Sequence, residues 1–128
     1  MSKAFLIPVF TVLLAVLTSC VDENKTDDPS VAEVNLYSSR HYDTDQALYD
    51  NFTEATGIKV NLIEAGADEL IARIQSEGVS SPADLLITVD AGRLWRAEQA
   101  GIFQPVTSAV LANRLPDNMR HPEGLWMG

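Results

Sequence analysis

The side chains best suited to binding chemistry are concentrated in residues 37–43, Tyr-Ser-Ser-Arg-His-Tyr-Asp. A phenol has a pKa near 10, so Tyr42 would bind as an anionic oxygen at neutral pH only to a strong Lewis acid such as ferric iron. His41 adds a nitrogen ligand, and Arg40 is suited to balance a co-bound anion such as carbonate. On residue types alone, a solvated loop whose aromatic rings pack on helix ends is the simpler interpretation.

Other side chains that could bind ligands or catalyse reactions have structural explanations. Tyr37 and Tyr49 fall within a predicted strand and a predicted helix, where packing explains them. Asp90 can cap a helix, and His121 lies in a turn-forming segment where we expect it to be solvated. The sequence contains no nucleophile elbow, glycine-rich phosphate loop, paired-cysteine site or His-Glu-x-x-His zinc helix. Because hydrolases and metalloenzymes depend on such motifs, the sequence disfavours an enzyme.

Residues 1–19 have the pattern of a secretory signal peptide. The apolar run after Lys3 is shorter than the roughly 20 residues of a membrane-spanning helix and is interrupted by Pro8. Residues 17–20, Leu-Thr-Ser-Cys, resemble the bacterial lipobox, whose cysteine is acylated and becomes the mature N-terminus. Cys20 is the only cysteine of the chain, so an internal disulfide is excluded. We predict a lipid anchor at Cys20; an ordinary leader with an incidental cysteine is the alternative.

Residues 20–32 are predicted to form the lipidated cysteine and an acidic tether. They are polar and almost free of large apolar groups, so they cannot bury enough surface to offset the entropy of ordering. The chain has 18 acidic and 9 basic residues, and Lys3 is the one basic residue of the leader, so the mature part carries a net charge of about −10. This charge argues against nucleic acid as a partner.

From Glu33 onward, strand and helix patterns alternate. The strand patterns fall at residues 34–37, 58–63 and 85–89, and the third is apolar enough to be buried on both faces. The helices are expected to begin with caps at Asp43, Asp68 and Asp90 and to end at Gly57, Gly78 and Gly101. Gln46 would complete a capping box with Asp43, and the apolar face of the first helix would be Leu48, Phe52 and Ala55.

A β-α-β-α-β-α order predicts an α/β fold with a parallel sheet and helices on both faces. Ligands of such sheets bind at the carboxyl ends of the strands, which are here the loops at residues 38–42, 64–67 and 89–92. Residues 108–114 are expected to form a short helix, and residues 125–128 resemble the start of another strand with nothing after it. We therefore expect the sequence to be truncated.

The segment 34–45 resembles the opening of the bacterial ferric-iron-binding proteins of ABC transporters. Most of the resemblance lies in the sequence of this segment, Val-Asn-Leu-Tyr-Ser-Ser-Arg-His-Tyr-Asp-Thr-Asp. Further stretches that fit the same family are residues 48–52, 56–60, 68–70, 81–84, 88–94 and 124–126. The resemblance spans residues 33–128.

This resemblance implies a periplasmic-binding-protein fold of type II, in which two α/β lobes close on Fe(III). Residues 33–128 would be the first lobe, incomplete. Tyrosine phenolates are the main ligands of the family, and in one branch the first loop contributes a histidine and a tyrosine, which His41 and Tyr42 match. The other tyrosines would come from the second lobe, beyond Gly128, so this chain would supply only part of the coordination.

The sequence thus predicts an exported, monomeric ferric-iron-binding lipoprotein on the periplasmic face of the cell envelope, anchored at Cys20. It would deliver Fe(III), with a synergistic anion such as carbonate, to the permease and ATPase of an ABC transporter. The alternative within binding proteins is a receptor for another small ligand, such as an anion or a polyamine, and the His41-Tyr42 pair argues against it. An exported metalloenzyme and a purely structural surface lipoprotein are hypotheses of other classes.

Overall fold

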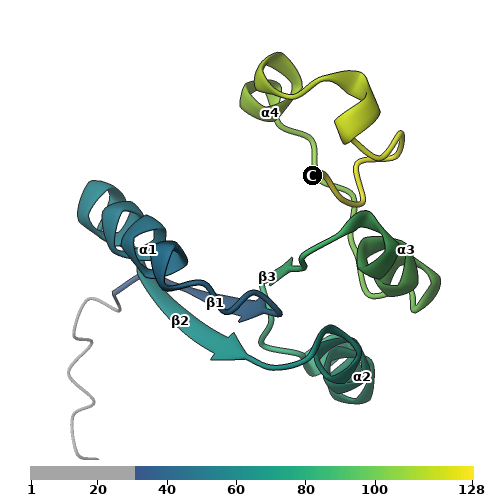
Figure 1. Cartoon of the computed structure of the whole chain (residues 1–128), viewed down its shortest axis with the longest axis horizontal. Coiled ribbons are helices and arrows are strands. Elements are labelled where there is room, and N and C mark those ends of the chain that lie inside the picture. Colours follow the sequence, from purple (N-terminus) through teal and green to yellow (C-terminus); the bar gives the residue numbers. More distant parts are fainter. Residues whose placement is uncertain (1–30) are drawn as a thin grey trace, which may run out of the picture.

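The computed structural model describes residues 31–128 and contains one parallel sheet with helices around it (Figure 1). The strands are β1 (Glu33–Ser38), β2 (Lys59–Glu64) and β3 (Leu85–Ile87), in the order β2-β1-β3. The helices are α1 (Asp43–Thr56), α2 (Ala67–Glu77), α3 (Ala91–Gln99) and α4 (Ala109–Arg114), with short 3-10 turns η1 (Gly78–Ser80) and η2 (Asp117–Met119). The predicted α/β class and the parallel sheet are confirmed.

The register of the sheet brings the ends of β1 and β2 to the same level. The parallel pairing runs from Glu33 opposite Lys59 to Ser38 opposite Glu64, and β3 pairs along the other side of β1. The carboxyl ends of the strands therefore meet at one edge, where ligands of parallel sheets bind.

The central strand is buried on both faces. Leu36 and Tyr37 are adjacent, so they point to opposite sides of the sheet, and both are buried. In Figure 1, α1 and α2 lie on opposite sides of the sheet, and α3 packs beside α2. Further buried apolar residues are Tyr49 of α1, Ala67, Leu70 and Ile71 of α2, and Ala97 of α3.

The first two helices differ in detail from the sequence-based expectation. The N-cap of α1 is Tyr42 rather than Asp43, and the capping box does not form because the Gln46 amide donates to Asp50 instead, at 2.8 Å. The predicted apolar face of α1 is also wrong, since Leu48 is 62% exposed whereas Tyr49 is buried. Similarly, α2 begins after Gly66, and Asp68 binds Arg96 of α3.

Other predictions about these elements are confirmed. Gly57, Gly78 and Gly101 follow the ends of their helices with positive φ, and the Asp90 carboxylate caps α3 by accepting from the Arg93 amide at 2.9 Å. However, β3 is shorter than expected and not buried on both faces. Leu85 is 54% exposed, because β3 forms one edge of the three-stranded sheet.

The segment after α4 folds back onto α3 rather than forming a strand. It contains a single antiparallel bridge between Arg120 and Met127. The Trp126 indole donates to one oxygen of Glu98 at 2.8 Å, and Nε2 of His121 lies 3.4 Å from the other. His121 is therefore a half-buried packing residue, and the expectation that it would be solvated is wrong.

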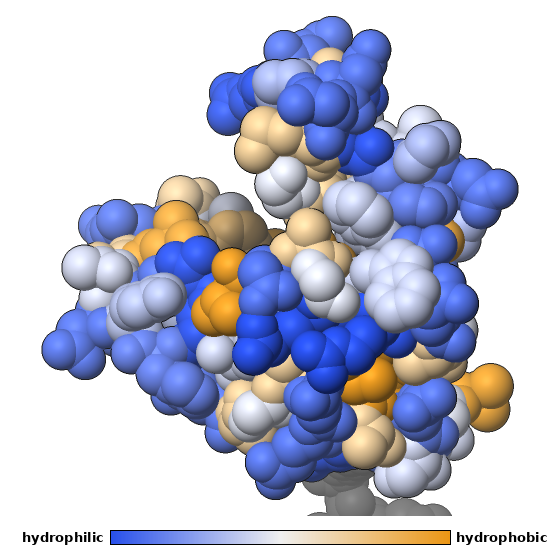
Figure 2. Space-filling model, turned by 45° about the vertical axis from the view of Figure 1, so that its right-hand side comes forward, coloured by the Kyte–Doolittle hydropathy of each residue, from blue (hydrophilic) through white to orange (hydrophobic). Residues whose placement is uncertain are grey.

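One face of the molecule is mainly hydrophilic. Figure 2 shows blue, hydrophilic residues over most of one face, with separate apolar patches among them. Within residues 31–128, no helix combines the length and the apolar character needed to cross a membrane.

Candidate metal site at the carboxyl edge of the sheet

The loop after β1 is fixed by its own serines. Ser38 is fully buried, and its hydroxyl accepts from the Arg40 amide at 3.1 Å and donates to the Arg40 carbonyl at 3.3 Å. The Ser39 amide donates to the Ile87 carbonyl of β3 at 2.9 Å. The loop is thus tied to the sheet immediately before Arg40, His41 and Tyr42, which restricts where these side chains can lie.

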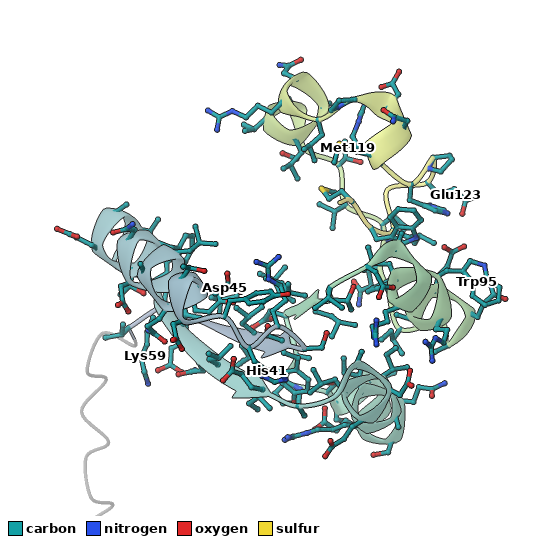
Figure 3. All side chains as sticks on the ribbon, viewed as in Figure 1. His41, Asp45, Lys59, Trp95, Met119 and Glu123 are labelled. Atoms are coloured by element: carbon teal, nitrogen blue, oxygen red, sulfur yellow. The ribbon has the colours of Figure 1, made fainter. Side chains whose placement is uncertain are left out.

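His41 extends from this loop toward the end of β2 (Figure 3). Its Nδ1 lies 3.6 Å from Oε1 of Glu64, and the His41 side chain is 60% exposed. Glu64 begins one of the loops predicted at the carboxyl ends of the strands, although its carboxylate was not among the predicted ligands. The strand register places it opposite Ser38, at the start of the loop that carries His41.

Tyr42 is the N-cap residue of α1 and is 57% exposed. The guanidinium carbon of Arg40 lies 5.1 Å from the centre of the Tyr42 ring, which is a cation–π distance. Arg40 and Tyr42 thus lie in contact, and His41, between them in the chain, is exposed on the same loop.

Arg40 is held mainly by Asp45 of α1. Its Nε and Nη2 donate to the two carboxylate oxygens at 2.8 and 3.0 Å, and this pairing raises the pKa of Arg40 and lowers the pKa of Asp45. Nη1 donates no hydrogen bond to residues 31–128. Asp45 thus occupies two of the three guanidinium nitrogens.

Two tyrosines do not belong to this edge. Tyr37 is fully buried, and its hydroxyl donates to Glu77 of α2 at 3.2 Å while Arg73 lies over its ring. Burial raises the pKa of the Tyr37 phenol, so this side chain is poorly suited to become a phenolate. Tyr49 is buried in α1, as expected of a packing residue.

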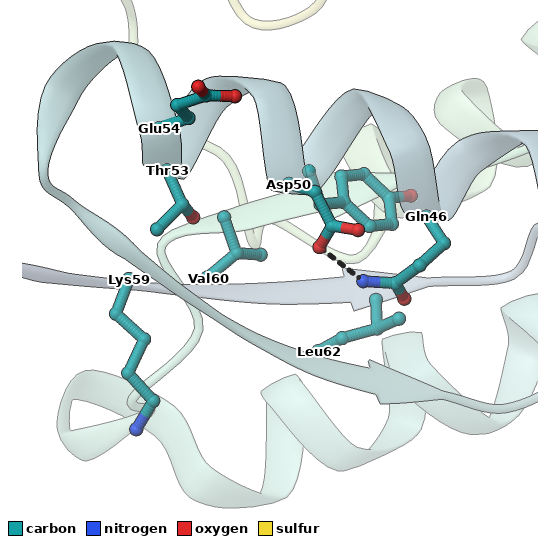
Figure 4. A pocket seen from close by; sticks show the side chains of 8 residues that line it. Gln46, Asp50, Thr53, Glu54, Lys59, Val60 and Leu62 are labelled. Carbon is teal, nitrogen blue, oxygen red and sulfur yellow. Dashed lines mark hydrogen bonds between the residues drawn. The ribbon is translucent and has the colours of Figure 1, made fainter.

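The groove between α1 and β2 is a different feature from this edge. Figure 4 shows it lined by polar side chains of α1, including Gln46 and Asp50, and by Val60 and Leu62 of β2. Neither His41 nor Tyr42 lines it. In the described part of the chain, no cluster of three or more histidine, cysteine or acidic side chains is placed to hold a metal ion. A site at the carboxyl edge would therefore depend on the phenol together with the imidazole.

The fold and this edge define a class of protein: a parallel α/β lobe of the kind found in solute-binding proteins, with an imidazole, a phenol and a carboxylate at the carboxyl ends of its strands. Comparison with known proteins agrees with this class, although no family model matches the chain.

Iron uptake protein A2 of Synechocystis is 68% identical over 95 residues, which are 74% of this chain and 26% of that protein. Iron uptake protein A1 of the same organism is 55% identical over 126 residues, 98% of this chain and 35% of that protein. Among solved structures, the Trichodesmium protein IdiA (FutA) in complex with iron and citrate is 66% identical with a TM-score of 0.73, and the match covers 76% of this chain and 31% of that one.

The chain is thus a homologue of the bacterial iron uptake and ferric-iron-binding proteins and has the fold of the matching part of their structures. It spans about a third of the length of the relatives it matches.

Proposed function

We propose that this protein binds ferric iron through His41 and Tyr42 and delivers it to an ABC transporter. The observation that carries the proposal is an exposed imidazole and an exposed phenol on consecutive residues at the carboxyl edge of a lobe whose homologues are iron uptake and ferric-iron-binding proteins. Ferric iron is the cargo, so the protein is expected to act by capture and release rather than as an enzyme.

The donor set fits a hard, highly charged cation. The Tyr42 oxygen would bind as a phenolate, because Fe(III) is a strong enough Lewis acid to displace the phenol proton, and His41 would add one nitrogen. An octahedral ion needs about six donors, so two side chains and water would hold it weakly. We therefore expect tight binding to need further donors from outside residues 31–128.

An anion would complete the charge balance. Arg40 stands 5.1 Å from the Tyr42 ring, and its Nη1 is the part of the fork that Asp45 leaves available. Carbonate fits this role because a guanidinium favours planar oxyanions. Citrate is a second candidate, since it accompanies iron in the Trichodesmium structure.

The proposed route places the protein on the periplasmic face of the cell envelope. Signal peptide 1–19, the lipid anchor at Cys20 and most of tether 20–32 lie outside the described residues, so their support is the sequence pattern. An acyl chain buried in a membrane contributes about 0.8 kcal/mol per methylene, and the tether would let a monomeric receptor reach the permease, whose ATPase supplies the energy.

The test is a visible absorption titration of the full-length protein with Fe(III) supplied as a weak chelate. We expect a phenolate-to-iron charge-transfer band that weakens or shifts in Tyr42→Phe, because that variant removes one oxygen ligand. Tyr37→Phe and Tyr49→Phe are matched controls, since each removes a buried phenol and leaves the exposed edge unchanged. Both controls should retain the wild-type band.

The alternatives give different results. A full-length protein without any band would refute the ferric proposal, and calorimetry with small anions and polyamines would then test the other binding class. A band that Tyr42→Phe leaves intact would show that iron binds elsewhere.

A further inference from the structure

We infer that Glu64 is a positioning residue that holds His41 with its proton on Nδ1, so that Nε2 is free to bind the metal. The metal-binding role of Nε2 in this inference rests on the proposed function. Its geometry is an observation independent of that function: the closest contact of the Glu64 carboxylate with His41 is to Nδ1, at 3.6 Å.

The position of Glu64 is set by the sheet rather than by a mobile loop. It is the last residue of β2, paired with Ser38 of β1, and the amide of the next residue, Ala65, donates to the Ser38 carbonyl at 3.3 Å. Ser38 in turn fixes the backbone of Arg40, immediately before His41. The carboxylate and the imidazole are thus attached to neighbouring points of one rigid edge.

This arrangement suits a metal-binding histidine. A neutral imidazole has one N–H and one lone pair, and a carboxylate near one nitrogen favours the proton on that nitrogen. Histidine ligands commonly donate their second N–H to a carboxylate, which orients the ring and increases the basicity of the ligating nitrogen. With its proton directed to Glu64, His41 would present Nε2 on the opposite side of the ring.

His121 provides an internal contrast. Its Nε2 lies 3.4 Å from Glu98, and its Nδ1 accepts from the amide of Glu123 at 3.2 Å. The two surroundings therefore favour opposite tautomers: Nδ1–H for His41 and Nε2–H for His121. Signals that disappear in His41→Gln and in His121→Gln variants assign the two histidines in the spectrum.

The experiment is a long-range ¹⁵N–¹H correlation spectrum of the full-length, metal-free protein at about pH 9, where free imidazole is neutral. We expect the Nδ1–H form for His41 in wild type and in Glu64→Gln, whose amide oxygen still accepts. Glu64→Ala should shift His41 to the Nε2–H form that predominates in free histidine. Glu54→Ala, which removes an exposed carboxylate on α1, is the matched control and should change neither histidine.

Iron affinity gives a second measurement on the same variants. We expect Glu64→Ala to weaken Fe(III) binding about 10-fold or more and Glu64→Gln to weaken it less. An Nε2–H form for His41 in wild type, or an unchanged tautomer in Glu64→Ala, would overturn the inference. Equal losses of affinity in both variants with the Nδ1–H form retained in Glu64→Gln would also overturn it, because the carboxylate would then act as a ligand. Failure of the proposed function would instead be the absence of any charge-transfer band, whatever the tautomer.

Discussion

Gly57 and Gly124 share a φ of +73°, but only Gly124 is crowded. A Cβ at Gly57 would meet nothing within 4 Å, whereas at Gly124 it would lie 2.7 Å from the carbonyl oxygen of Val106. The Val106 amide also donates to the Gly124 carbonyl at 3.0 Å, so the two backbones are held together. We therefore expect Gly124→Ala to destabilise the structure more than Gly57→Ala.

The two substitutions separate conformational strain from steric overlap. Placing an alanine in the left-handed region costs about 1–2 kcal/mol, and this cost is common to both sites. Forcing atoms into a filled space adds about 1–3 kcal/mol, and at Gly124 the clash is with backbone, which no side-chain rotation relieves. We expect a loss of about 1–2 kcal/mol for Gly57→Ala and about 2–5 kcal/mol for Gly124→Ala.

Native-state hydrogen exchange measures this loss at the contact itself. A loss of about 2 kcal/mol should accelerate exchange of the Val106 amide roughly 30-fold in Gly124→Ala, since 1.4 kcal/mol corresponds to a factor of ten. Gly57→Ala should affect this amide only through global stability, followed separately by urea unfolding. If both variants exchanged equally at Val106, the overlap would contribute nothing and the reasoning would be refuted.

Two further predictions concern the core and the ion pair of the site. Leu70→Ala should cost about 2–5 kcal/mol because Leu70 is 1% exposed, whereas Leu48→Ala, at a position 62% exposed, should change stability by less than about 0.5 kcal/mol; equal urea midpoints would contradict this. Because Arg40 lowers the pKa of Asp45, the pair stabilises the fold above the ordinary aspartate pKa of about 3.9 and loses its effect as pH falls through the lower folded-state value. The difference in melting temperature between wild type and Asp45→Asn should therefore shrink on acidification, and a difference that stayed constant to about pH 2 would exclude this ion pair as its source.

Hydrophobic periodicity predicted the order of the helices and strands correctly, but it predicted less well which of their residues are buried. Leu48 and Phe52 recur at helical spacing but are exposed, whereas Tyr49, which was separately expected to pack, is the residue that α1 buries. A sequence shows that an apolar face exists, whereas what covers it depends on the neighbouring elements. Similarly, the apolar run that begins at Leu85 predicted a strand buried on both sides, and its exposure follows from the position of β3 at the edge of the described sheet.

Local chemistry was readable from the sequence only where the partners are close in the chain. His41 and Tyr42 are adjacent, so their juxtaposition needed no fold, and the Asp90 cap uses a residue three positions away. Glu64 is twenty-three positions from His41, and its approach depends on the register that pairs it with Ser38. Sequence reasoning could locate that strand end but could not align it with the first loop.

The exposure of the candidate ligands affects how Fe(III) would be bound and released. His41 is 60% and Tyr42 57% exposed, so an ion bound by them alone would keep water as most of its coordination shell. Fe(III) held in this way would exchange readily, and strong binding would require further donors brought against this edge. If those donors lie on a part of the protein that moves relative to residues 31–128, closure completes the shell and opening removes several ligands at once. A receptor with all its ligands on one rigid lobe would instead release the ion only by dissociation of those ligands one at a time.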